Sequence, residues 1–183
     1  GNEVLWDDGA GDTRGLTVGG APDPEVDLDY WATTADATYV YFLIGLGAYA
    51  GAGTPPHVQI AIAANLDYAG NQTWYDPLGS GTGAAGREII PTVYPDYLIT
   101  TDVLTGTATL WEAASNPGTW TSSTIVPLAW SGTTGVIEVA LPWTAFSAGP
   151  PFGPGSTAYI TLMTAHSAPA DGLSDAPSTA EDD

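Results

Sequence analysis

Apolar and polar residues alternate with a period of two along much of this chain. The alternation is clearest in the stretch Val26, Asp27, Leu28, Asp29, Tyr30 and Trp31. A period of two indicates a β-strand with one face on a core. Thr34, Ala35 and Asp36 supply a polar turn, and residues 39–46 are then apolar at nearly every position, as in a strand covered on both faces. A covered strand needs a second layer, so the pattern favours a sandwich of two sheets.

The rest of the chain repeats this pattern of short strands separated by Gly, Pro and Asp. We expect further strands at Glu3 to Trp6, His57 to Leu66, Asp96 to Asp102, Gly106 to Glu112, Trp120 to Val126, Gly135 to Leu141 and Thr157 to Ala165. Pro142 to Phe146 favours one helical turn, with proline at its first position. The sequence therefore predicts an all-β fold of about nine antiparallel strands with long loops and minimal helix.

Length and composition are those of one domain. The chain has 183 residues and no linker-like segment that would divide it, so we expect a single domain over residues 1–183. Residues 1–23 hold the first strand and a segment rich in Gly and Pro, and residues 167–183 form an acidic C-terminal segment. The bias toward Gly, Pro, Thr, Ala and Asp is typical of secreted β-proteins, so we expect an extracellular or cell-surface location.

The chain is strongly acidic. It has no lysine, two arginines (Arg14 and Arg87) and a formal net charge of −19. Binding to nucleic acid or to anionic membranes depends on clustered Lys and Arg, so neither is an expected partner. No apolar run reaches the roughly 18 residues of a membrane span, and membrane insertion is not expected.

The order of several motifs resembles the DOMON-like superfamily. These motifs are Asp-Asp-Gly-Ala-Gly-Asp at residues 7–12, the segment from Val26 to Phe42, Val-Gln-Ile-Ala-Ile at 58–62, Val-Ile-Glu-Val-Ala-Leu-Pro-Trp-Thr-Ala-Phe at 136–146 and Ser-Asp-Ala-Pro at 174–177. More closely, the chain is similar to family 9 carbohydrate-binding modules and to C-terminal modules of extracellular glucan-degrading enzymes. The resemblance implies an immunoglobulin-like β-sandwich of two antiparallel sheets, often with structural calcium, and with sugar or haem as ligand.

Aromatic residues outside the strand cores favour polysaccharide as the ligand. The chain has seven Trp and nine Tyr, and sugar rings dock on flat aromatic faces that combine apolar area with a polar tip. Trp74 and Tyr75 lie in the long segment from Asn71 to Gly86, and Trp111 and Trp120 flank another loop. We therefore expect these four residues to form the binding platform.

Clustered carboxylates and amides suggest calcium as a cofactor. Calcium binds six to eight oxygens, which acidic loops supply. Two groups of residues are candidates: Asp7, Asp8, Asp12, Asp171 and Asp175 near the two chain ends, and Asn65 and Asp67 after a strand. In the alternative interpretation these residues only form turns and face solvent.

Haem and catalysis have weaker support. Met163 and His166 are three apart on a predicted strand, so they project to opposite faces, and no haem is expected. The Gly-x-Gly-x-x-Gly match at residues 81–86 has neither a strand before it nor a helix after it. No Gly-x-Ser-x-Gly, His-Glu-x-x-His or cysteine nucleophile is present, so we expect no enzyme activity.

Self-assembly is the alternative function. Lysine on edge strands is a common guard against sheet-to-sheet pairing, and this chain has no lysine. The short strand from Glu3 to Trp6 precedes a segment rich in Gly and Pro, and could be exchanged with a second copy. The alternative is therefore a structural subunit of an extracellular filament or surface layer, joined by strand addition.

Overall fold

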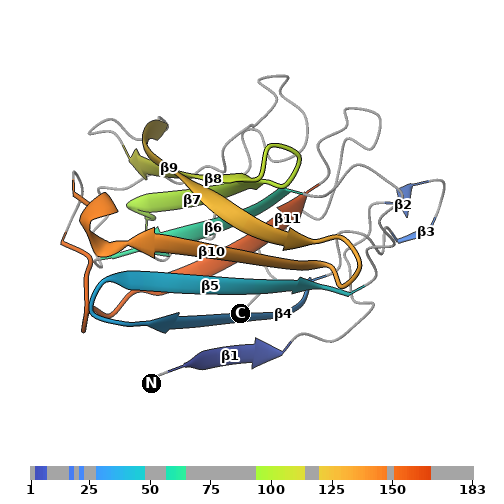
Figure 1. Cartoon of the computed structure of the whole chain (residues 1–183), viewed down its shortest axis with the longest axis horizontal. Helices are drawn as coiled ribbons and strands as arrows, with labels where there is room; N and C mark the ends of the chain where they lie inside the picture. Colours follow the sequence, from blue (N-terminus) through green and yellow to red (C-terminus); the bar gives the residue numbers. More distant parts are fainter. Residues whose placement is uncertain are drawn as a thin grey trace.

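The computed structural model of this chain is an antiparallel β-structure (Figure 1). It describes residues 3–7, 17–18, 21–22, 28–47, 57–64, 94–113, 120–147 and 151–165. The elements are β1 (Val4–Asp7), β2 (Thr17–Val18), β3 (Ala21–Pro22), β4 (Leu28–Ala35), β5 (Tyr39–Leu46), β6 (His57–Ala63), β7 (Tyr97–Asp102), β8 (Thr107–Ala113), β9 (Trp120–Ser131), β10 (Val136–Pro142), the 3-10 helix η2 (Trp143–Ala145) and β11 (Tyr159–Ala165). The prediction of an all-β fold with short strands is confirmed, and no helix among the described residues is long and apolar enough to cross a membrane.

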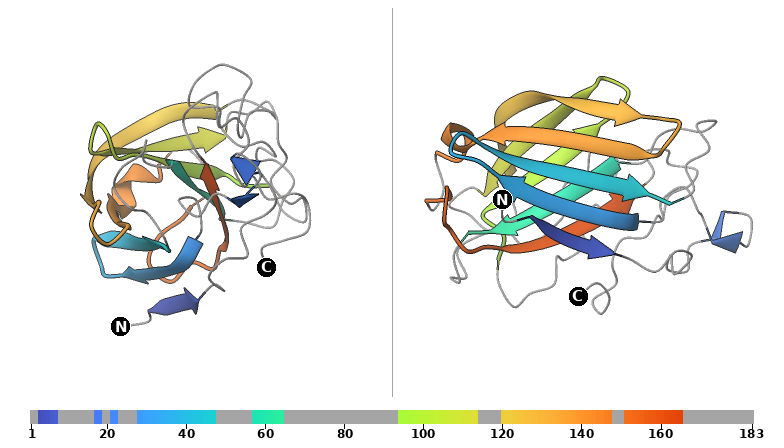
Figure 2. Two further views of the ribbon diagram at one scale, coloured as in Figure 1. Left: turned by 90° about the vertical axis from the view of Figure 1, so that its right-hand side faces the viewer. Right: turned by 60° about the horizontal axis from the view of Figure 1, so that its bottom comes forward.

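Nine strands form one continuous sheet in the order β1-β4-β5-β10-β9-β8-β7-β6-β11, and β2 pairs with β3 separately. The sheet curls around one of its own faces (Figure 2). Strand β9 is the corner of this curl. Its first part, Trp120 to Pro127, pairs with β8, and its last part, Leu128 to Ser131, pairs with β10. The prediction of two separate packed sheets is not confirmed, because β9 belongs to both halves.

A single hydrophobic core lies inside the curl. Alternate residues of β5, among them Phe42 and Ile44, are buried there with Ile137 and Leu141 of β10. The opposite half of the sheet contributes its own alternate residues, Val58, Ile60 and Ile62 of β6, Ile99 of β7 and Leu110 of β8. Each fully buried aliphatic side chain is worth about 1.5 to 3 kcal/mol relative to exposure. The period of two found in the sequence selects one face of β8 and β10 for the core, whereas β6 and the first half of β7 are buried on both faces.

An aromatic cluster closes one end of the core. Phe146 contacts the ring of Tyr97 edge to face at 5.1 Å and the ring of Phe152 at 5.1 Å. Trp143, in the helical turn η2, lies 5.4 Å from Phe152 between ring centroids. The indole Nε1 of Trp143 also donates to the backbone oxygen of Asp36 at 2.9 Å. The predicted helical turn is present but spans only Trp143–Ala145, so Pro142 precedes its first residue. The turn links the end of β10 to the turn between β4 and β5.

Two local predictions for β4, the start of its turn at Thr34 and an unbroken alternation from Leu28 to Tyr30, were wrong. Strand β4 continues through Ala35, and the turn begins at Asp36, whose Oδ1 accepts from the backbone N–H of Thr38 at 2.6 Å. A register irregularity between Leu28 and Tyr30 reverses the alternation, so that Trp31, opposite Ile44, packs against the core in place of Tyr30.

The β5 strand is buried on one face only. Its outward residues Tyr39, Tyr41 and Leu43 are exposed or half-exposed. The prediction that both of its faces are covered was therefore wrong.

Candidate functional site

Two of the four predicted sugar-binding residues lie within the described part of the chain. Trp111 is on β8 and Trp120 begins β9, and both are half-buried. Trp111 is opposite Ser122, while Trp120 is opposite Ala113. Trp74 and Tyr75 lie outside the described residues.

The register places the two indoles on the same face of neighbouring strands. Trp111 and Ala113 are two residues apart on β8, and cross-strand partners share a face, so Trp120 faces the same side as Trp111. Such diagonal neighbours have Cα atoms about 7 to 8 Å apart, within reach of large side chains. This face of β8 and β9, which we call the indole face, includes Trp111 and Trp120.

A hydrogen bond across the sheet orients one indole. The Nε1 of Trp111 donates to the hydroxyl of Thr100 on β7 at 2.8 Å. Indole has a single hydrogen-bond donor, so this bond uses it within the protein. What Trp111 offers a ligand is therefore its apolar π surface, and hydrogen bonds to a ligand would come from neighbours such as the half-buried Thr100 and Thr109.

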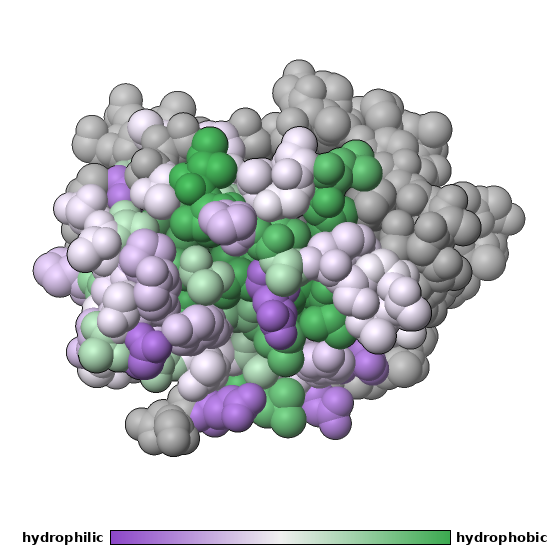
Figure 3. All heavy atoms as spheres, viewed as in Figure 1, coloured by the Kyte–Doolittle hydropathy of each residue, from purple (hydrophilic) through white to green (hydrophobic). Residues whose placement is uncertain are grey.

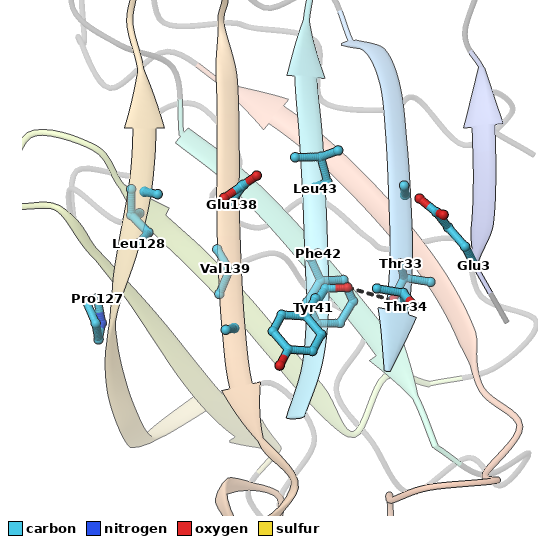
Figure 4. A pocket seen from close by; sticks show the side chains of 13 residues that line it. Glu3, Thr33, Thr34, Tyr41, Phe42, Leu43, Pro127, Leu128, Glu138 and Val139 are labelled. Carbon is cyan, nitrogen blue, oxygen red and sulfur yellow. Dashed lines mark hydrogen bonds between the residues drawn. The ribbon is translucent and has the colours of Figure 1, made fainter. Parts of the chain in front are cut away.

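A second feature, which the sequence did not predict, is a groove of about 600 Å³ on the outer face of the other half of the sheet. Figure 4 shows its lining residues, which come from β4, β5, β10 and β9 and from Glu3, the residue before β1. It is lined by Glu3, Ala32, Thr33, Thr34, Tyr41, Phe42, Leu43, Pro127, Leu128, Ala129, Glu138, Val139 and Ala140. We call it the outer groove. In Figure 3, apolar residues gather on this face, with hydrophilic residues among them.

Cross-strand register explains how these residues meet. Leu5, Ala32, Leu43, Glu138 and Ala129 form one row, each opposite the next across five strands. The neighbouring row contains Thr34, Tyr41 and Ala140. Ala32, Ala129 and Ala140 have short side chains and stand between larger residues, so this part of the sheet face is a depression.

The groove carries negative charge, and no described Lys or Arg lies near it. Glu3 and Glu138 are exposed acidic residues in its lining. The two arginines of the chain, Arg14 and Arg87, lie outside the described residues, so the described part contains neither lysine nor arginine. The charge of Glu138 therefore lies among apolar neighbours such as Leu43 with no basic side chain of the described structure to neutralise it.

A hydrogen-bonded turn at one end of the groove perturbs two titratable groups. The Tyr41 hydroxyl donates to Oδ2 of Asp36 at 2.9 Å, while the backbone N–H groups of Thr38 and Tyr39 donate to Oδ1. The backbone N–H groups, and then the Tyr41 hydroxyl, lower the pKa of Asp36 below its ordinary value. The same Asp36 hydrogen bond raises the pKa of Tyr41. The ring of Tyr41 is thereby held beside that of Tyr39, with centroids 6.0 Å apart.

The predicted calcium ligands are largely outside the described residues. Asp7 ends β1 and is exposed, while Asp8, Asp12, Asn65, Asp67, Asp171 and Asp175 are not described. Among the described residues no group of three or more His, Cys, Asp or Glu is placed to hold a metal ion. Calcium binding stays a prediction.

Two carboxylates are buried near the carboxyl end of β8. Oδ2 of Asp96 accepts from the backbone N–H of Ala64 at 2.8 Å, which joins the start of β7 to the end of β6. Glu112, beside Trp111 in sequence, points to the buried side, and its Oε1 has no hydrogen-bond partner in the described structure. Its proximity to the indole face in sequence does not make it part of that face, because neighbouring residues on a strand point to opposite sides.

The chain was compared with protein-family models, with curated proteins and with solved structures, and none of them matches. The indole face and the outer groove are therefore the two candidate sites of this chain.

The sequence signal for the outer groove was present but incomplete. Tyr41 and Leu43 are the alternate positions of a strand whose other residues form the core. Their outward direction follows from periodicity, but their neighbours on β10 come from a distant part of the chain. Pairing over such separations is set by sheet topology, which periodicity does not specify.

Proposed function

We propose that this protein is a non-catalytic module that binds polysaccharide through exposed aromatic side chains, outside the cell or at its surface. The observation that carries the proposal is the placement of Trp111 and Trp120 on one face of neighbouring strands. Two half-exposed indoles side by side offer a flat apolar platform, which suits the faces of sugar rings. Hydroxyls of Thr100 and Thr109 on the same face supply polar contacts at its border.

The family resemblance supports the same proposal at the level of the fold. In this interpretation the two halves of the curled sheet correspond to the two layers of a DOMON-like, immunoglobulin-like sandwich. Trp74 and Tyr75 complete the platform in the proposal, as the sequence predicted.

The test is binding to insoluble glucan, xylan and cellulose, with isothermal titration of soluble oligosaccharides from any polymer that binds. Trp111→Ala and Trp120→Ala should each weaken binding by about 1 to 3 kcal/mol, the usual cost of losing a desolvated aromatic anchor. The matched control is Tyr159→Ala, because Tyr159 is an aromatic residue on β11 that is 55% exposed. Unchanged affinity in both tryptophan variants, with the parent protein binding, would remove the indole face from the proposal.

A second candidate, assembly by strand addition, is favoured by the state of β1. This strand of four residues lies at an edge of the sheet and pairs with β4. Its apolar side chains are poorly covered, with Val4 54% and Leu5 66% exposed. A strand with so little side-chain burial can be replaced at low cost by the same strand of another copy.

Strand addition is tested on the intact chain by negative-stain microscopy and light scattering. If copies exchange β1, excess synthetic peptide of residues 1–7 should occupy the β4 edge and suppress fibres or oligomers. A peptide of the same composition in scrambled order is the control. Monodisperse monomers over a wide concentration range would contradict this candidate and leave polysaccharide binding as the function under test.

A further inference from the structure

The outer groove lies on a sheet face that no described element covers. Its row of Leu5, Ala32, Leu43, Glu138 and Ala129 crosses five strands. Since neighbouring strands lie about 4.8 Å apart, the row is about 19 Å long. An extended peptide rises about 3.3 Å per residue, so a segment of about six residues matches this length.

Charge decides which kind of occupant suits the groove. Glu138 is exposed in an otherwise apolar row, and Glu3 lies at the β1 end of the groove. The ring of Tyr41 lies in the neighbouring row, and its face can attract a cation. A ligand with apolar stems and positive ends would bury the alanine and leucine surface and neutralise both carboxylates.

A second copy of this chain does not fit those requirements. A two-fold interface would bring the same acidic face of both copies together. Each copy carries a net charge of −19, and its two arginines are the only Lys or Arg in the sequence. Like charges brought together at an interface cost several kcal/mol, so a partner of opposite charge is favoured.

We propose that the outer groove binds an extended segment of another protein in which lysine or arginine alternates with apolar residues. Across the sheet, Glu3 and Glu138 are three strand spacings apart, about 14 Å, which equals about four residues of extended chain. Along the strands, Glu3 falls in the neighbouring row, that of Thr34, because Val4 is opposite Thr33. Two cationic side chains four positions apart therefore face the two carboxylates, and the residue midway between them faces Leu43 and Ala32. This binding is independent of the indole face.

The probe is the peptide Lys-Ser-Leu-Ser-Lys, blocked at both ends and labelled for fluorescence anisotropy. Its two lysines and its leucine project to one side of an extended chain. The comparison peptide carries norleucine in place of both lysines, which keeps the stems and removes the charges. The lysine peptide should bind more tightly than the norleucine peptide, and the difference should shrink as salt is added.

Variants of the full chain locate the binding. Glu138→Gln should weaken the lysine peptide about 5-fold to 10-fold, since one close charge pair is lost, and should leave the norleucine peptide unchanged. The matched control is Asp102→Asn, which removes the same charge from the other half of the sheet at the end of β7. Glu138→Lys should reverse the preference, so that a peptide with glutamate in place of lysine binds better.

Several results would overturn the proposal. The first is that the lysine peptide does not bind. The second is that Asp102→Asn and Glu138→Gln lose equal affinity for the peptide. The third is that only an oligosaccharide displaces the bound peptide. Trp111→Ala separates the two sites. It should weaken polysaccharide binding without affecting the peptide, so failure of one proposal leaves the other open to its own test.

Discussion

Asp36 organises the turn between β4 and β5 through three hydrogen bonds, from two backbone N–H groups and the Tyr41 hydroxyl. These bonds favour the carboxylate, so its pKa is lower in the folded chain than the value of about 3.9 in an unfolded one. The resulting stability is present above about pH 4 and is lost as the pH falls through the lower folded value.

We expect the free energy of unfolding of Asp36→Asn to depend less on pH below about pH 4 than that of the wild-type chain. Urea denaturation from neutral pH down to about pH 2 should show the wild-type chain losing free energy of unfolding below about pH 4 more steeply than the variant. Glu138→Gln is the control, because Glu138 is another exposed carboxylate of the same sheet. Parallel curves for wild type and Asp36→Asn would show that the turn does not depend on this carboxylate.

The same contact affects the alkaline side in the opposite direction. The hydrogen bond to Asp36 raises the pKa of Tyr41 above its ordinary value of about 10. Its contribution to stability is therefore present below about pH 10 and is lost as the pH rises through the higher folded value. Tyr41→Phe should remove this alkaline dependence, and absorbance titration of the tyrosines measures the shift directly.

At the level of elements, two hairpins of the sheet turn through glycines with the same backbone conformation. Gly106, between β7 and β8, has φ of 68°, and Gly135, between β9 and β10, has φ of 67°. Their surroundings differ. A Cβ at Gly106 would meet open space, whereas one at Gly135 would lie 2.5 Å from the backbone oxygen of Leu46.

Alanine at Gly106 would strain only the backbone, whereas alanine at Gly135 would also clash with the backbone of Leu46. Comparing the two variants separates these two costs. Gly106→Ala should cost about 1 to 2 kcal/mol of unfolding free energy, the penalty for a left-handed non-glycine residue. Gly135→Ala should cost at least about 1 kcal/mol more, because the β5 backbone has to move and strain the hydrogen bond from Leu46 N–H to Gly135 oxygen. Chemical denaturation of both variants measures the difference. Equal losses would mean that β5 yields to the added methyl group without cost.

At the level of the whole molecule, excess negative charge opposes compaction. The chain has 21 acidic residues against two arginines, and like charges in a folded chain repel one another. A cation bound by several carboxylates would relieve this repulsion and stabilise the folded state by mass action. Asp7 lies exposed at the end of β1, where it could join ligands from outside the described residues.

We expect calcium to raise the melting temperature of metal-free protein at constant ionic strength, and a chelator to reverse the rise. Magnesium should be less effective, because it is smaller and releases its water reluctantly. Asp7→Asn should reduce the calcium response, with Asp102→Asn as the control of equal charge. Identical melting curves with and without calcium would leave the acidic residues as surface and turn residues.

Local pattern was sufficient to predict most strands and the helical turn. The β5 strand from Tyr39 to Leu46 and the turn η2 after Pro142 follow from alternation and from proline chemistry within a few residues. These predictions succeeded because periodicity and turn preferences act over short stretches of chain.

Only tertiary structure decided the curl of the sheet and the outer groove. Strand β9 changes partner after Pro127, and the groove joins Leu5 of β1 to Glu138 of β10 through β4 and β5. Such pairings depend on register between segments far apart in sequence, and one irregularity, as before Tyr30, exchanges the two faces of a strand. Residue pattern therefore specifies which side chains alternate, whereas packing of the whole sheet specifies which of them meet.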